Sequence, residues 1–118
     1  MSSVPSKSAH LLATLFLGAT LAAPAALAAD KPQTFTGRVS DAMCGSGHMM
    51  AGKPAECVRA CIRKGSNYAL VVGDKVYALD TSDKSALDTL DKLADQQAKV
   101  TGQANGDTIA VSSVAPAQ

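Results

Sequence analysis

The chain has 118 residues, of which 47% are hydrophobic and 18% charged, and its formal net charge is +1. A charge so close to neutral gives no electrostatic reason to bind nucleic acid or anionic lipid. The chain contains no tryptophan and 3% aromatic residues. A small domain with so few large side chains gains stability from a covalent or metal cross-link.

The N-terminal segment has the three parts of an export signal. Lys7 precedes an apolar run that begins at Leu11, and the segment ends in Ala26-Leu27-Ala28. We expect residues 1–28 to be cleaved, leaving a periplasmic or secreted protein with no membrane anchor. Removing Lys7 from the eleven Lys and Arg leaves ten, which balance the ten Asp and Glu.

After a tail at residues 29–33, β-branched and alternating residues predict five strands. Two-residue turn signals, Gly73-Asp74 and Asn105-Gly106, join the second strand to the third and the fourth to the fifth. The predicted strands span 34–40, 68–72, 75–79, 98–102 and 108–111.

Two helices are predicted between these strands. Pro54 suits the first turn of a helix over 54–64, and Gly65 suits the position after its end. Ser82 or Asp83 can cap a second helix that reaches Ala94. An apolar stripe lies along this second helix, and acidic residues one turn apart mark its solvated face. The stripe is Leu87, Leu90 and Leu93, and the acidic residues are Asp88, Asp91 and Asp95.

The order strand, helix, strand, strand, helix, strand, strand predicts a mainly β domain. It fits an OB-like, five-stranded, partly open barrel with the cysteine-bearing helix between strands 1 and 2. The other reading of this order is an unspecified small α+β sandwich. We place the single domain at 34–114 and expect a loose C-terminal tail at 115–118.

These segments resemble a family of small exported bacterial proteins with an OB-like barrel and uncharacterised function. The resemblance covers nearly all of the mature chain and implies a fold and a location, but no reaction. It is carried by Gly37-Arg38-Val39-Ser40-Asp41, Cys44, Cys57-x3-Cys61, Gly65, Val76-Tyr77-x-Leu79, Val100-Thr101-Gly102 and Ile109-x-Val111.

The three cysteines and His48 lie in one short stretch, spaced Cys44-x3-His48-x8-Cys57-x3-Cys61. Cys57 and Cys61 share one face of the predicted helix, where Cβ atoms are about 5–6 Å apart. A disulfide needs about 3.5–4.5 Å, so these two cysteines suit a shared metal ion better than each other. The alternative is that both are small buried hydrophobic residues.

Cys44 lies in the loop before this helix and has two possible roles. It can form a disulfide with Cys57 or Cys61, closing a loop of about 13–17 residues and stabilising the domain by about 3 kcal/mol. It can instead complete a metal site with both helical thiols and His48, since three cysteines and one histidine form a known zinc set. Flanking thioethers favour Cu(I) as an alternative to zinc; the possible extra ligands are Met43, Met49 and Met50.

Asp41 ends the first strand, where it either orients a histidine ligand or caps a turn. We predict a binding domain rather than an enzyme, holding copper or zinc through Cys44, Cys57, Cys61 and His48. The first alternative is a disulfide-stapled OB-like module that binds a small molecule or an envelope protein. The second is a thiol redox protein in which His48 activates Cys44.

Overall fold

The computed structural model describes residues 18, 31–47 and 52–118. The predicted signal therefore lies outside the described residues, apart from Gly18. Within the described residues, no helix has both the length and the apolar character that crossing a membrane requires. The elements are β1 (Gln33–Asp41), α1 (Pro54–Arg63), β2 (Tyr68–Val72), β3 (Lys75–Asp80), α2 (Lys84–Lys92), β4 (Gln97–Asn105) and β5 (Thr108–Pro116).

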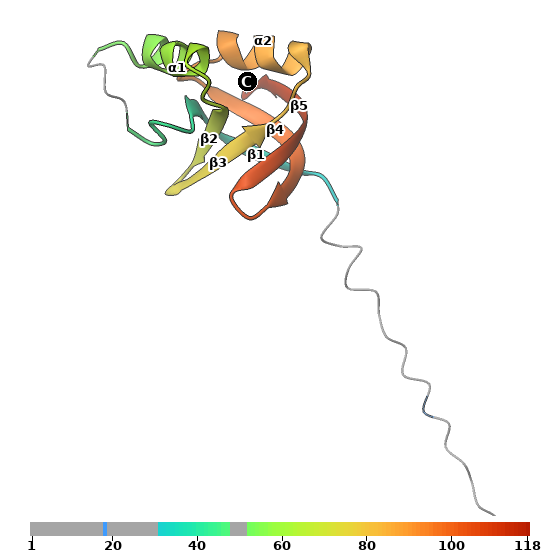
Figure 1. The fold of residues 1–118 in the computed structure, drawn as a ribbon. Helices are drawn as coiled ribbons and strands as arrows, with labels where there is room; N and C mark the ends of the chain where they lie inside the picture. Colours follow the sequence, from blue (N-terminus) through green and yellow to red (C-terminus); the bar gives the residue numbers. More distant parts are fainter. Residues whose placement is uncertain (1–17, 19–30, 48–51) are drawn as a thin grey trace, which may run out of the picture.

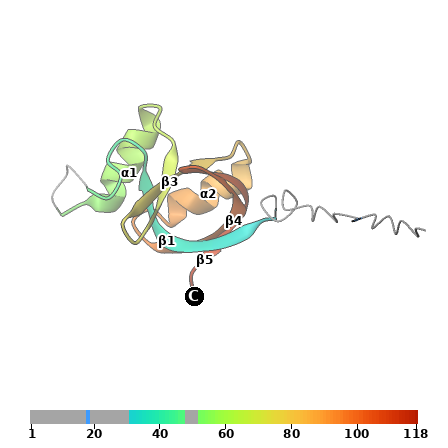
Figure 2. The same cartoon turned by 90° about the horizontal axis from the view of Figure 1, so that it is seen from below.

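The five strands form one sheet whose hydrogen bonds run in a closed ring, in the order β1-β2-β3-β5-β4 (Figure 2). β1 pairs antiparallel with β2 on one side and with β4 on the other. The ring closes where β3 and β5 pair in parallel, with Leu79 opposite Ile109. The mainly β architecture with two helices is confirmed. The expectation of a partly open sheet is wrong, because the β3–β5 pairing leaves no free edge in the ring.

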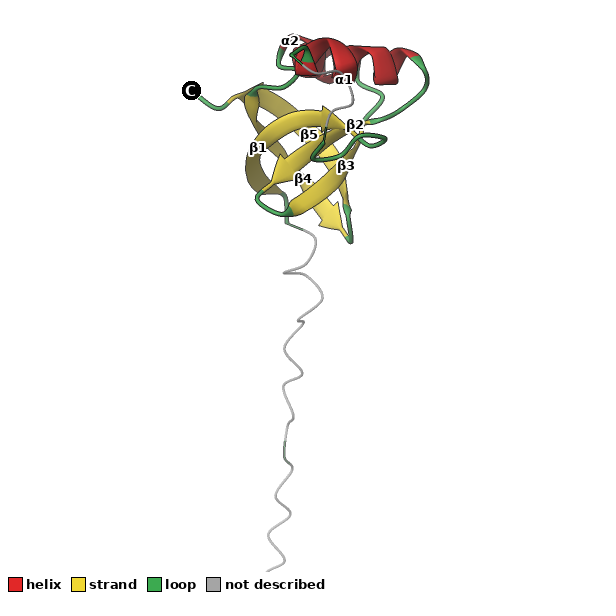
Figure 3. Ribbon diagram, turned by 90° about the vertical axis from the view of Figure 1, so that its left-hand side faces the viewer, coloured by secondary structure: helices red, strands yellow, loops and turns green. Residues whose placement is uncertain are grey.

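Both helices lie at the same end of the sheet (Figures 1 and 3). α2 connects β3 to β4 and lies across one end of the ring (Figure 2). α1, which carries Cys57 and Cys61, connects β1 to β2 and packs beside the ring against β1. This is the position that the sequence predicts for the cysteine helix.

Local signals explain where the two helices begin and end. Pro54 occupies the first turn of α1, and Gly65 follows its end with φ of +101°, a value that side chains rarely allow. The Asp83 carboxylate caps α2 by accepting hydrogen bonds from the backbone N–H groups of Ser85 and Ala86.

The core fills the inside of the ring and the space beneath the helices. Leu90 and Leu93 of the predicted apolar stripe are buried, and Leu87 packs against the core from a partly buried position. The buried side chains of α1 are Cys57 and Val58. The buried cluster comprises Val39, Val58, Tyr68, Leu70, Leu79, Leu90, Leu93, Ala94, Ala98, Val100 and Ile109.

Two segments differ from the sequence prediction. β5 runs to Pro116 because its last residues pair with β4, so the expected loose tail at 115–118 begins inside a strand. The second helix ends at Lys92, so Asp95 lies beyond it rather than on its solvated face. Asp95 has φ of +62° and pairs with Arg38 at 2.9 Å.

Gly37 and Gly102 allow neighbouring strands to approach each other closely. A Cβ atom at Gly37 would overlap the carbonyl of Val71, and one at Gly102, beside an irregularity in the β4–β5 register, would overlap the carbonyl of Ala110. Both neighbours are backbone atoms, which cannot move without disturbing the sheet.

We therefore predict that Gly37→Ala and Gly102→Ala each destabilise the protein by about 1–3 kcal/mol, because the added methyl group overpacks the sheet. Gly47→Ala is the matched control, since its Cβ would approach only the Cys44 carbonyl at 3.9 Å. Denaturant unfolding curves measure all three. Unchanged stability in the first two variants would contradict the close approach.

Candidate metal centre

The structure brings all three cysteine thiols together. The Cys44 sulfur lies 4.0 Å from the Cys57 sulfur and 3.7 Å from the Cys61 sulfur. All three sulfurs lie within 4.8 Å of one another, a spacing that allows them to hold one metal ion. None of the three cysteines is in a disulfide, so neither alternative disulfide of Cys44 is formed in this structure.

Helix α1 positions two of the three thiols. Cys57 lies in the first turn, where its N–H donates to the carbonyl of Lys53 at 3.0 Å, and its side chain is buried. Cys61 lies one turn later on the same face and is half-buried. The predicted i,i+4 arrangement is therefore present, with one sulfur against the core and the next nearer the surface.

The end of β1 positions the third thiol. Asp41 accepts hydrogen bonds through Oδ1 from the N–H groups of Met43 (3.0 Å) and Cys44 (2.9 Å). The hydroxyl of Ser40 donates to the carbonyl of Gly45, whose own N–H donates to the Asp41 carbonyl at 2.8 Å. These bonds fold the loop back over the end of β1 and direct Cys44 toward α1. The prediction that Asp41 caps a turn is confirmed.

Arg38 also supports this loop, and sequence reasoning gave it no role. Its Nη2 donates to the carbonyl of Ser46 at 3.0 Å, and its Nη1 pairs with Asp95 at 2.9 Å. The guanidinium thereby connects the cysteine loop to the segment that follows α2. Only the alternation of side chains along β1 could have suggested that Arg38 and Ser40 lie on the same side of the strand.

The other predicted ligands have different outcomes. His48, Met49 and Met50 lie outside the described residues, so their roles remain predictions. Met43 is 66% exposed and lies at the surface of the loop. The structure thus brings together the cysteine part of the predicted set.

The surroundings of the cluster favour protonated thiols in the absence of a cation. Burial raises the pKa of the Cys44 thiol to about 12, helped by its hydrogen bonds with Cys61 and Cys57 and by the negative charge of Asp41. Burial also raises the pKa of Cys61, and the charge of Asp41 acts in the same direction, against a lowering by the hydrogen bond with Cys44. A nucleophilic redox cysteine needs the opposite shift.

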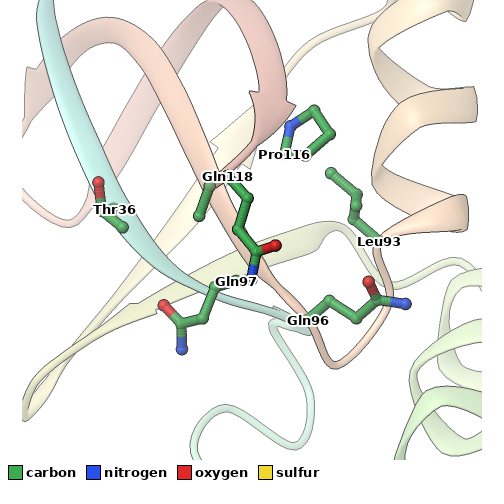
Figure 4. A pocket seen from close by; sticks show the side chains of 7 residues that line it. Thr36, Leu93, Gln96, Gln97, Pro116 and Gln118 are labelled. Carbon is green, nitrogen blue, oxygen red and sulfur yellow. The ribbon is translucent and has the colours of Figure 1, made fainter.

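A separate hollow of about 540 Å³ lies away from the cysteines, between the end of α2 and the last residues of the chain (Figure 4). Its polar groups are amides and a hydroxyl, and none of its lining side chains is titratable. The lining consists of Thr36, Leu93, Gln96, Gln97, Pro116, Ala117 and Gln118. The three thiols, by contrast, are close enough together to hold a metal ion.

Comparison of the chain with protein-family models, curated proteins and solved structures gives no match. The interpretation of the site accordingly depends on its own geometry and charge.

We predict that Cys44 of the reduced, metal-free protein reacts with iodoacetamide at pH 8 at least about tenfold more slowly when folded than in denaturant. A raised pKa keeps the folded thiol protonated at this pH, and only the thiolate attacks. Peptide mapping by mass spectrometry gives the rate for each cysteine. Equal rates in the folded and unfolded protein would contradict the raised pKa, and a faster reaction in the folded protein would favour the redox alternative.

Proposed function

We propose that this protein is an exported, OB-like domain that binds one soft or borderline metal ion, copper or zinc, through Cys44, Cys57 and Cys61. The observation that carries the proposal is the convergence of all three thiols of the chain from two separate elements. Cys44 comes from the loop after β1, whereas the other two come from α1.

The sulfur spacing matches the size of such a site. Thiolates bound tetrahedrally at a zinc–sulfur distance of about 2.3 Å lie about 3.8 Å from one another. The distances from the Cys44 sulfur to the other two sulfurs, 3.7 and 4.0 Å, lie on either side of that value. The thiols therefore need little rearrangement to bind a single ion together.

Charge supports the same proposal. Burial raises the pKa values of Cys44 and Cys61, and the negative charge of Asp41 acts in the same direction, so free thiolates are unfavourable here. A bound cation would offset this cost, because a coordinated thiol loses its proton. The arrangement is thus unfavourable for free thiolates and favourable for thiolates around a metal.

The position of the cluster suits an ion that enters and leaves. Cys57 is buried, whereas Cys44 and Cys61 are half-buried, so one side of the cluster is open to solvent. This arrangement suits binding and delivery of an ion. A closed structural site would enclose all of its ligands.

The strand order supports the OB-like part of the proposal. A five-stranded closed ring in the order β1-β2-β3-β5-β4, with α2 between β3 and β4, is consistent with an OB-like topology. The N-terminal signal pattern supports export, and an oxidising compartment keeps the disulfide-stapled module as the alternative function.

We predict that the mature protein, purified without chelator, carries about one ion per chain. Replacing Cys44, Cys57 or Cys61 by serine should lower its affinity by at least about a hundredfold, since losing a direct ligand costs more than losing a supporting group. Native mass spectrometry with elemental analysis measures the stoichiometry. Ser112→Ala, an exposed change on β5, serves as the control.

The same preparation distinguishes the disulfide alternative. Three titratable thiols after denaturation, together with one bound ion, support the metal site. A mass two daltons lower, with one free thiol and no ion, would replace the metal site with a disulfide of Cys44.

We also predict that loading the reduced protein with zinc at pH 7 releases at least about two protons per ion. Cys44 and Cys61 have raised pKa values, so both are protonated before binding and lose their protons on coordination. A weakly buffered titration with a pH indicator measures the release. Release of less than one proton per ion would show that these thiols are not ligands.

A further inference from the structure

Asp41 is the buried acidic group nearest to the cysteine cluster in sequence, and its side chain is fully buried at 0% exposure. Its Oδ1 atom is used by the loop, since it accepts from the N–H groups of Met43 and Cys44. These two bonds fix the carboxylate at the end of β1, so the position of its second oxygen is also determined.

The second oxygen, Oδ2, is buried and has no hydrogen-bond partner among the described residues. Burying a carboxylate oxygen without a partner is costly, and native structures with such an atom usually reserve it for a ligand, an ion or water. Nothing in the folding of the loop requires this oxygen, because Oδ1 already holds the backbone.

The carboxylate lies next to the cysteine loop, because its Oδ1 atom is 2.9 Å from the backbone nitrogen of Cys44. Arg38, a basic side chain that also binds this loop, contacts Ser46 and Asp95. The negative charge of Asp41 therefore lies close to a residue whose thiol would help to hold an ion.

We propose, building on the proposed function, that Asp41 determines which ion the cluster holds, its buried charge selecting a divalent ion such as zinc over Cu(I). Three thiolates and one carboxylate carry four negative charges. Zn²⁺ leaves two of them uncompensated, whereas Cu⁺ leaves three, and uncompensated buried charge is unfavourable.

Asp41→Asn is the informative substitution, because it removes the charge and keeps a carbonyl oxygen for the two loop N–H groups. Zinc and Cu(I) affinities are each measured on the reduced protein, without oxygen, by competition with a chromophoric chelator. A unit charge a few ångströms away, at an effective dielectric constant of about 20, changes a binding constant by about ten- to a hundredfold. We expect the ratio of zinc to Cu(I) affinity to fall by that factor.

Two controls separate charge selection from loop support and from net charge. Ser40→Ala removes a different bond to the same loop, so it should weaken both ions equally and leave the ratio unchanged. Asp88→Asn makes the same change of net charge at an exposed position on α2 and should also leave the ratio unchanged. If Asp41→Asn does not fold, Asp41→Ser provides a second neutral variant that retains a hydrogen-bond acceptor.

The outcomes for this inference and for the proposed function are distinct. A fall in the ratio for neutral Asp41 variants alone supports charge selection. An unchanged ratio in those variants, with metal still lost from the cysteine variants, overturns charge selection and leaves the metal site intact. Failure of the unaltered reduced protein to bind either ion overturns both.

Discussion

The hydrogen bonds that Asp41 accepts from the loop after β1 determine where Cys44 lies relative to α1. β1 pairs with β4 over residues 33–38 and with β2 over residues 38–41, so its end is held by β2, with Asp41 opposite Tyr68. Asp41 transmits that position to Cys44 through the backbone N–H groups of Met43 and Cys44. Without this turn, Cys44 would belong to a glycine-rich loop with no defined relation to α1.

The same carboxylate makes the site sensitive to charge. It stabilises the loop through one oxygen and leaves the other buried without a hydrogen-bond partner among the described residues. Burial, together with the Asp41 charge, favours protonated Cys44 and Cys61 thiols in the metal-free cluster. A bound cation would change that balance, because coordinated thiols lose their protons.

Much of the fold could be predicted because its signals are local. Pro54 and Gly65 delimit α1, Gly73-Asp74 marks one hairpin, and the i,i+4 spacing of Cys57 and Cys61 gives their shared face. Ring closure could not be predicted in this way. It depends on the parallel pairing of β3 with β5, which are 28 or more residues apart and separated by α2 and β4.

The candidate site shows the same difference between local signals and tertiary contacts. Helical spacing was sufficient to pair two thiols, whereas the approach of Cys44 depends on tertiary contacts of Ser40, Asp41 and Arg38. The turn of the β4–β5 hairpin also differs from its predicted position. Asn105 pairs with Thr108, which moves the turn to Gly106-Asp107, one residue beyond the dipeptide that signals it.

Each helix buries two side chains within its own bounds, namely Cys57 and Val58 in α1 and Ala86 and Leu90 in α2. The chain that follows α2 adds the buried Leu93 and Ala94. In α1, one of the two buried side chains is itself a proposed ligand. An ion shared by Cys44, Cys57 and Cys61 would therefore add a cross-link between α1 and the loop that follows β1.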